Sequence, residues 1–468
     1  MLHKKNNLFN ICFISGKLGD VDGVSRETEK WISVLAGMGH GLYTVSGFYA
    51  SEFTEVPYKQ QLTIKDLSFS SPRQEYYENL VFPYLGENST HLSEENLQLL
   101  QDELLEEGRK IAGVLYQFIQ KNSIDMIIAE NTNALPMTLL GAVAVNELVQ
   151  TYKVAALFHH HDFWWERSRF CESHIEQLLN RIMPPRNISV EHVVTSSYAE
   201  HVLSSVKRVK PHIVPNCADF DHPPIKDNYN RQFREDFGFA EDDLLFVQPT
   251  RIVPRKRIED SIRLMAQFSR KYSFLAHKIH FIITLHHSNE PDSPYLQNLI
   301  SLAGSLDVHF HIITDRVYSC RTEKNGQRCY TNADVLINAD LVTYLPAWEG
   351  FGNALLETIA ARVPLVTTTY LIYKTDIRGS GIQPVEIRDR YDGQGNLIID
   401  PSVLEEIYEV LTEEKIRNLR VGLSFKRAAD EFGIHILKTR LASILDNYSD
   451  EIRASRRRLQ ISRQSYYV

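Results

Sequence analysis

Cysteine is scarce in this sequence. Five cysteines occur in 468 residues, an odd number without the paired spacing of a zinc site. Cys320 and Cys329 bracket a polar loop, and their oxidation to a disulfide stays open. Otherwise the cysteine usage is that of proteins from a reducing compartment. We therefore expect no zinc site and a cytoplasmic location.

Long apolar runs and excess positive charge are also missing. A membrane-spanning helix needs roughly 20 apolar residues, and no run here approaches that length. The apolar residues 11–14 follow two lysines but are too few for the core of a signal peptide. A formal net charge of -8 argues against a nucleic-acid partner, which favours a basic surface. We expect neither an integral membrane segment nor a nucleic-acid partner.

The length of the chain indicates two domains. A chain of 468 residues is too long for one core of ordinary size, and 43% hydrophobic with 24% charged residues is a globular composition. Pro215-Asn216 leads into polar, proline-containing sequence, which is typical of a linker. We place the first domain at residues 1–217 and the second at 218–441, followed by a helix at 442–468. The sequence gives no indication of the oligomeric state.

Strands and helices alternate along both halves, which predicts α/β domains with parallel sheets. A strand, a loop, a helix and a second strand open the chain, as in a Rossmann-type unit. The loop has no full G-x-G-x-x-G, so a nicotinamide dinucleotide site is poorly supported. The clearest expected strands are residues 8–15, 42–45, 124–130, 154–158, 190–195, 244–250, 279–284, 308–313, 339–346 and 364–368. Residues 48–95 are expected to form loops and short strands that face a cleft, and residues 370–378 a loop. The polar insertion 315–333 has no clear pattern.

One stretch, residues 348–357, combines a strand end, a Gly-Phe-Gly turn and a helix start. Such a joint places backbone N–H groups and the positive end of a helix where an anion can bind. Glu349 and Glu357, with seven residues between them, can both border one pocket and accept hydrogen bonds from sugar hydroxyls. An ordinary joint with two solvated glutamates is the alternative.

Four cations crowd residues 251–257, just before another helix. A solvated turn is one interpretation. A diphosphate leaving group is the better one, because its developing charge needs fixed cations. We assign Arg251 and Lys256 to that diphosphate and expect Arg255 and Arg257 to be peripheral.

A third cluster follows the strand that ends near residue 158, where three histidines precede Asp162, Trp164 and Trp165. Successive strand residues point to opposite faces, so the three histidines cannot all reach one metal ion. Aromatic faces stack on sugar rings, and His161 and Asp162 offer hydrogen bonds to hydroxyls. We expect a sugar site here, with a structural role for one or two of the histidines.

Together these motifs resemble the retaining GT-B glycosyltransferases of family 4, the glycosyl transferases group 1. Glu349 and Glu357 match the E-x7-E signature, and Arg251 with Lys256 matches the paired cations of that family. The resemblance implies two Rossmann-like domains facing each other across a cleft, with residues 442–468 crossing back to the first domain. The family's Gly-Gly pair is Asp22-Gly23 here, so only Gly23 is expected to approach a phosphate.

The resemblance also implies the roles of the site residues. Arg251 and Lys256 would stabilise the departing diphosphate, and the amides of Gly352, Asn353 and Ala354 would assist. Glu357 would hold the ribose hydroxyls, and Glu349 and His161 would face the transferred sugar. Asp162, Trp164 and Trp165 are expected on the acceptor side, with no metal and no cofactor.

The predicted function is therefore transfer of a hexose, with retention, from a nucleotide sugar to a hydroxyl of a small molecule or saccharide. UDP-glucose and GDP-mannose are the favoured donors. Tyr370, Tyr373 and Lys374 stand where the family has glycines, so the donor preference cannot be transferred. A glycan phosphorylase is disfavoured because no lysine motif for pyridoxal phosphate is evident, and a catalytically silent binding protein is the alternative. The basic residues 452–459 fit a solvated helix, with a membrane-surface or acidic-acceptor role left open.

Overall fold

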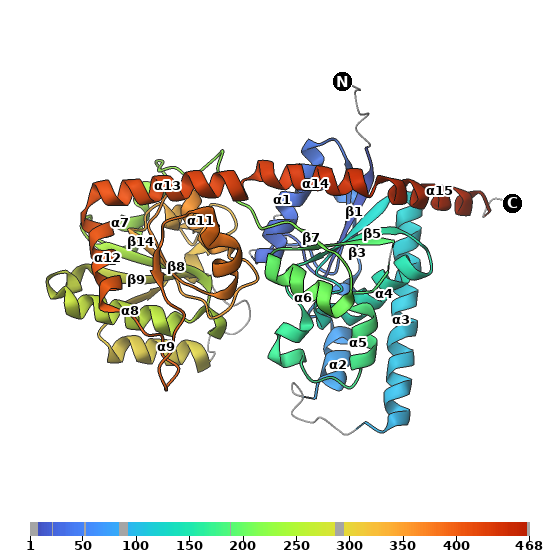
Figure 1. Ribbon diagram of the computed structural model, residues 1–468, viewed down its shortest axis with the longest axis horizontal. Helices are drawn as coiled ribbons and strands as arrows, with labels where there is room; N and C mark the ends of the chain where they lie inside the picture. Colours follow the sequence, from blue (N-terminus) through green and yellow to red (C-terminus); the bar gives the residue numbers. More distant parts are fainter. Residues whose placement is uncertain are drawn as a thin grey trace. The chain divides into compact units, whose positions relative to one another are not determined.

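The computed structural model describes residues 8–20, 22–50, 53–83, 92–187, 189–285 and 294–465. The chain forms two compact units (Figure 1): residues 1–215 with 437–468, and residues 216–436. From the sequence alone we place the domain boundary at 217/218 and the start of the last segment at 442. The chain passes between the units twice.

The first unit is built on a seven-stranded sheet, all of whose strands are parallel, in the order β3-β2-β1-β4-β5-β6-β7. The strands are β1 Asn10–Ser15, β2 Gly41–Ser46, β3 Gln61–Thr63, β4 Met126–Glu130, β5 Ala155–His160, β6 Val190–Val194 and β7 His212–Ile213. The helices are α1 Gly23–Gly37, α2 Pro72–Val81, α3 Glu94–Lys121, α4 Leu139–Gln150, α5 Glu176–Ile182, α6 Ser197–Lys207 and α15 Ser449–Ser465, together with most of α14 Ile434–Asn447. Strands β4 and β5 are buried along their whole length, as expected for continuous apolar runs in a parallel sheet.

The second unit repeats this architecture with six parallel strands in the order β10-β9-β8-β14-β15-β16. The strands are β8 Leu244–Arg251, β9 Ile279–Leu285, β10 His309–Ile312, β14 Leu341–Tyr344, β15 Leu365–Thr368 and β16 Val385–Ile387. The helices are α7 Phe233–Phe237, α8 Ile258–Lys271, α9 Pro294–Ser305, α10 Asn332–Leu336, α11 Asn353–Ala360, α12 Pro401–Thr412 and α13 Glu414–Phe432. The predicted α/β class with two Rossmann-like sheets is confirmed.

Three segments differ from the sequence prediction. The unassigned insertion forms a second small sheet in this unit, with the order β11-β13-β12: β11 Val317–Tyr318, β12 Thr322–Lys324 and β13 Gln327–Thr331. The expected loop after β15 is instead helical around Tyr373–Ile377, because Tyr370 and Tyr373 are buried and hold it against the core. Helix α2 lies within the segment expected to form loops and short strands, and it is capped by Ser71, whose hydroxyl accepts from Gln74 N.

The carboxyl-terminal helix α15 packs on the first unit through β4 and β5. Cys320 and Cys329 are both free. No helix within the described ranges is long and apolar enough to cross a membrane.

Candidate active site

The joint between β14 and α11 needs glycine at position 352. Gly352 is the N-cap of α11 and has a φ of +134°, a conformation that other residues rarely adopt. A Cβ at this position would lie 2.6 Å from the hydroxyl oxygen of Tyr370. That hydroxyl donates to the carbonyl oxygen of Phe351 at 2.7 Å, and this hydrogen bond holds the turn in place.

Helix α11 begins with backbone amides rather than a capping side chain. Among the described residues, no side-chain oxygen caps its N-terminus, and its first bonds run from Leu355 N and Leu356 N to Gly352 O. The amides of Asn353 and Ala354 come before those bonds, at the positive end of the helix. Asn216 donates from Nδ2 to Asn353 Oδ1 at 2.5 Å, so the start of the second unit is tied to this helix.

Glu349 is a buried carboxylate held by two cations. It is 7% exposed and forms ion pairs with Lys256 and Arg255. The distance from Arg255 Nη1 to Glu349 Oε2 is 2.8 Å. Burial alone would raise the pKa of Glu349, but the charges of Arg255 and Lys256 outweigh it and lower the pKa to about 2. Glu349 is therefore ionised at neutral pH.

The partners of Glu349 come from the end of the neighbouring strand. Strand β8 pairs with β14, so the loops after both strands meet at one edge of the sheet. Ala347 N donates to Arg255 O at 3.0 Å, and Gln248 Nε2 donates to Lys256 O at 3.0 Å. These bonds fix the short turn Pro254–Lys256 that carries both cations.

Lys256 is 9% exposed and lies over the ring of Tyr344, with Nζ 5.3 Å from the ring centre. Burial lowers the pKa of Lys256 to about 8, against the opposing attraction of Glu349. The charges of Arg255 and Arg251 also lower this pKa, and Arg251 is the last residue of β8, just before the turn that carries Lys256. Arg255, which we expect to be peripheral to the diphosphate, pairs directly with Glu349.

Glu357 lies on α11 and contacts a different part of the unit. Asn332 donates from Nδ2 to Glu357 Oε2 at 3.2 Å. The hydroxyl of Thr284, near the end of β9, donates to Asn332 Oδ1 at 2.8 Å. Sequence spacing alone gave no indication of either contact.

His161 and Asp162 lie in the first unit, where the ends of β4 and β5 are adjacent. His161 Nε2 is 3.4 Å from Glu130 Oε2, and its backbone N–H donates to Asn131 Oδ1 at 3.1 Å. The amide of Asn131 also donates to Asp162 Oδ1 at 3.2 Å, and Arg167 pairs with the second oxygen of Asp162. Burial would lower the pKa of His161, but the hydrogen bond and charge of Glu130 raise it.

Two histidines of this cluster are structural. His159 is buried, stacks on Trp31 with ring centres 4.1 Å apart and lies 3.0 Å from Glu130. His160 lies 3.0 Å from His192 in the core. This outcome agrees with the expectation that not all three histidines reach a ligand.

The same geometry leaves one possible set of metal ligands among the described residues. Ligand atoms of Glu130, His159 and His161 lie within 4.8 Å of one another. Residues two apart on a strand share a face, so His159 and His161 can approach the same point although His160 cannot. Glu130 of β4 supplies a carboxylate beside them. In the structure these atoms bond to each other, and the absence of metal remains a prediction.

The two tryptophans expected on the acceptor side belong to the packing of the first unit. Trp164 is 5% exposed, belongs to the main core, and donates from Nε1 to Met183 O at 3.0 Å. Trp165 is partly buried and stacks on Phe163 with ring centres 4.7 Å apart. An aromatic cluster after a strand can face the core or a ligand, and sequence alone does not distinguish these.

Asp22 occupies the N-terminus of α1, beside Gly23. Its side chain accepts from Val24 N and Ser25 N and pairs with Lys17 at 3.0 Å. A carboxylate thus already uses the helix amides at which the family resemblance would place a phosphate. The assignment of Gly23 to the donor remains a prediction.

The second unit therefore brings Arg255, Lys256 and Glu349 together beside the N-terminus of α11. The charge of Arg251 lowers the pKa of Lys256. Two Rossmann-like units, the second with cations beside a helix start, are the features that the resemblance to GT-B glycosyltransferases implies. Residues 230–375 match the family of glycosyl transferases group 1. The predicted family resemblance and the GT-B fold are thereby confirmed, and the match supports a glycosyltransferase that uses a nucleotide-sugar donor.

Individual proteins match over nearly the whole chain. The chain is 29% identical to a mannosylglucosylglycerate synthase of Thermotoga maritima over 444 residues, which is 92% of this chain and 97% of the relative. A synthase of the same name from Petrotoga mobilis is 28% identical over 420 residues, 84% of this chain and 91% of the relative. The solved structure of WaaG, a glycosyltransferase involved in lipopolysaccharide biosynthesis, has a TM-score of 0.58 at 14% identity and covers 93% of this chain and 99% of its own.

Proposed function

We propose that the protein is a retaining, metal-independent hexosyltransferase that moves mannose from GDP-mannose to a hydroxyl of a small anionic saccharide. Both curated relatives are named for a product that contains mannosyl, glucosyl and glycerate groups. This favours GDP-mannose over UDP-glucose and glucosylglycerate as the acceptor.

The observation that carries this proposal is the cluster of cations at the α11 joint. Lys256 and Arg255 both pair with Glu349, and the positive charge of Arg251 acts on Lys256. A nucleoside diphosphate leaving group gains negative charge as its bond to the sugar breaks, and fixed cations stabilise that charge. Amides at the start of α11 add to this effect. The chain's own cations thus support a reaction without metal.

The proposed reaction follows a dissociative route on one face of the sugar. The bond from the anomeric carbon to the diphosphate oxygen breaks, and the diphosphate keeps the electron pair. The acceptor oxygen then bonds to that carbon from the same face, and its proton passes to the departing diphosphate. Glu349 supports this route over a carboxylate nucleophile, because both of its oxygens are held by cations. We assign Glu357 to the ribose hydroxyls and His161 to the transferred sugar.

The test is a transfer assay in EDTA with GDP-mannose or UDP-glucose as donor and glucosylglycerate or glycerate as acceptor. We expect release of GDP and an α-linked mannosyl product. Mass spectrometry identifies the product, and the one-bond C1–H1 coupling constant identifies its anomeric configuration. Lys256→Met should lower kcat/KM by at least about a hundredfold. An exposed lysine supplies the control, because Lys271→Met should leave the rate unchanged. Inversion, a requirement for added metal, or turnover of UDP-glucose alone would each contradict a part of the proposal.

A further inference from the structure

The three-stranded insertion ends directly at the donor half of the candidate site. Strand β13 runs into α10, whose first residue is Asn332. Asn332 is the residue that donates to Glu357 Oε2, at 3.2 Å. An insertion that sequence analysis could not assign thus delivers one side chain to a carboxylate of the E-x7-E pair.

The orientation of the Asn332 amide is fixed by its second contact. Thr284 is fully buried, and its hydroxyl donates to Asn332 Oδ1 at 2.8 Å. A carboxylate only accepts hydrogen bonds, so the amide nitrogen of Asn332 faces Glu357, and the amide oxygen accepts the bond from the Thr284 hydroxyl. Thr284, Asn332 and Glu357 therefore form an ordered chain of hydrogen bonds.

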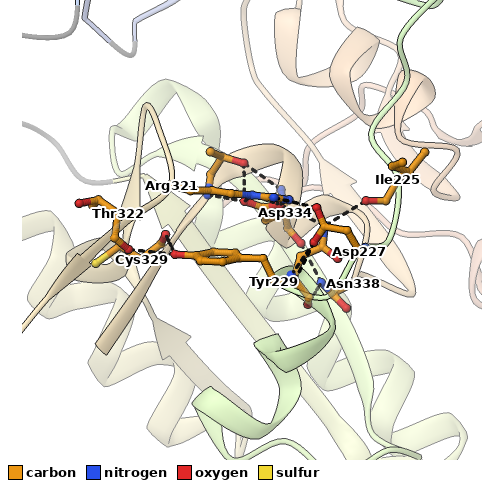
Figure 2. Close-up of polar contacts among 10 residues, drawn as sticks. Ile225, Asp227, Tyr229, Arg321, Thr322, Cys329, Asp334 and Asn338 are labelled. Atoms are coloured by element: carbon orange, nitrogen blue, oxygen red, sulfur yellow. Dashed lines mark hydrogen bonds and ion pairs between the residues drawn. The ribbon is translucent and has the colours of Figure 1, made fainter. Parts of the chain in front are cut away.

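A polar network around the insertion fixes the position of α10 (Figure 2). Thr331 and Asp334 form a capping box, in which Thr331 Oγ1 accepts from Asp334 N and Asp334 Oδ2 accepts from Thr331 N at 3.0 Å. Figure 2 shows Asp334 beside Arg321 and Asp227. Arg321 binds Asp334 through Nη2 at 2.5 Å and reaches Asp227 through Nη1 at 2.7 Å. The hydroxyl of Tyr229 donates to the carbonyl oxygens of Thr322 and Cys329, each at 2.9 Å. These contacts hold both ends of the insertion against the body of the second unit.

We propose that Asn332 is a positioning residue that orients Glu357 for recognition of the ribose diol of the nucleotide sugar. This inference rests on the proposed function. The Asn332 amide holds one carboxylate oxygen, so the carboxylate cannot rotate, and the geometry that accepts two hydroxyl hydrogen bonds is set before the nucleotide arrives. Pre-organisation of this kind improves affinity because less freedom is lost on binding. Asn332 thereby contributes to discrimination between ribonucleotides and nucleotides that lack the ribose hydroxyls.

The test compares the affinities of GDP and 2′,3′-dideoxy-GDP by isothermal titration calorimetry. We expect wild type to prefer GDP strongly, because both hydroxyls bond to a charged acceptor. Asn332→Ala should lower the ratio of the two dissociation constants by about tenfold, through weaker binding of GDP alone. Thr284→Val, which removes only the hydroxyl that orients the amide, should lower the ratio in the same direction. Gln327→Ala removes an amide from an exposed position of β13, the strand that leads into α10, and its ratio should equal that of wild type.

The outcomes separate this inference from the proposed function. Wild-type protein that binds no nucleoside diphosphate would overturn both. Normal GDP binding with an unchanged ratio in Asn332→Ala and Thr284→Val would overturn the role of Asn332 alone. Equal weakening of GDP and dideoxy-GDP would show a general structural effect and would also overturn it. A double variant with Glu357→Ala should lose no further discrimination beyond Glu357→Ala itself.

Discussion

Glu349 and Lys256 are buried charged groups, and burial of either one without the other would cost free energy of folding. Glu349 is 7% exposed and Lys256 is 9% exposed, yet each offsets the desolvation of the other. Arg255 completes the cluster at 2.8 Å from Glu349. The site is therefore held in a charged state before any ligand binds.

Removal of the Glu349 charge should destabilise the protein. Glu349→Gln leaves Lys256 buried beside Arg255 without a counter-charge, and loss of one partner of a buried ion pair costs about 3 kcal/mol. Urea unfolding followed by circular dichroism measures this change. The control is Glu405→Gln, whose partner Lys271 lies at the surface and whose own side chain is 67% exposed. Equal stabilities of the two variants would contradict the account of Glu349.

The lowered pKa of Lys256 should be visible in the pH dependence of catalysis. With a pKa of about 8, the ammonium that binds the diphosphate loses its charge as pH rises through that value. We expect kcat/KM for the donor, which reports the free enzyme, to fall above pH 8. In Lys256→Arg the charge persists, so this alkaline limb should disappear although the activity is lower. An unchanged limb in that variant would assign the titration to another group.

At the level of elements, the β14–α11 joint depends on the conformation of one residue. Gly352→Ala introduces a strained φ and a Cβ that overlaps the Tyr370 hydroxyl. We expect a loss of about 2 kcal/mol in the free energy of unfolding, together with weaker nucleotide binding. Tyr370→Phe in the same chain should restore part of the loss by relieving the overlap. Gly379→Ala, at an open position, should be neutral, and an equally harmless Gly352→Ala would contradict the strained geometry.

The main elements could be predicted from sequence because their patterns are local. Buried strands such as β4 and β8 are apolar runs, and long helices such as α3 have an apolar face. The insertion could not be predicted, because its short polar strands depend on contacts distant in sequence, such as Arg321 with Asp227. The helical turn after β15 depends likewise on the burial of Tyr373.

Part of the candidate site could also be predicted from local sequence patterns. Lys256 and Glu349 could be selected by motif spacing, and their pairing follows from the adjacency of β8 and β14. Arg255 and Asn332 could not, because the direction of a side chain in a turn, or after an insertion, is set by tertiary contacts. Glu130 offered a usable signal, since it ends a strand beside the one that carries His161.

At the scale of the whole molecule, the carboxyl terminus completes the first unit. Ser455 Oγ accepts from Ala155 N at 3.1 Å, and the hydroxyl of Tyr448 accepts from Ala156 N at 2.9 Å. Arg456 pairs with Asp125 at 2.5 Å. At least one of the basic residues of α15, Arg456, therefore helps to hold this helix on the first unit.

Loss of the Tyr448 hydroxyl should destabilise the first unit. Tyr448→Phe leaves Ala156 N and the Ser189 carbonyl without this partner, and such buried groups cost roughly 1–3 kcal/mol. Three of the four tryptophans lie in the first unit, so fluorescence in a Trp348→Phe background reports that unit alone. Tyr58→Phe, at an 87% exposed position, is the control. Equal midpoints of urea unfolding in the two variants would remove the structural role of Tyr448.

In the proposed reaction, the second unit binds a nucleotide sugar at the α11 joint without metal. The most direct measurement is calorimetric titration of GDP, UDP and ADP in EDTA into wild type and Glu357→Ala. We predict binding of GDP by wild type and at least about tenfold weaker binding by the variant, the loss of one good hydrogen bond or more. Absence of binding for all three nucleotides, or equal affinity in the variant, would contradict the account.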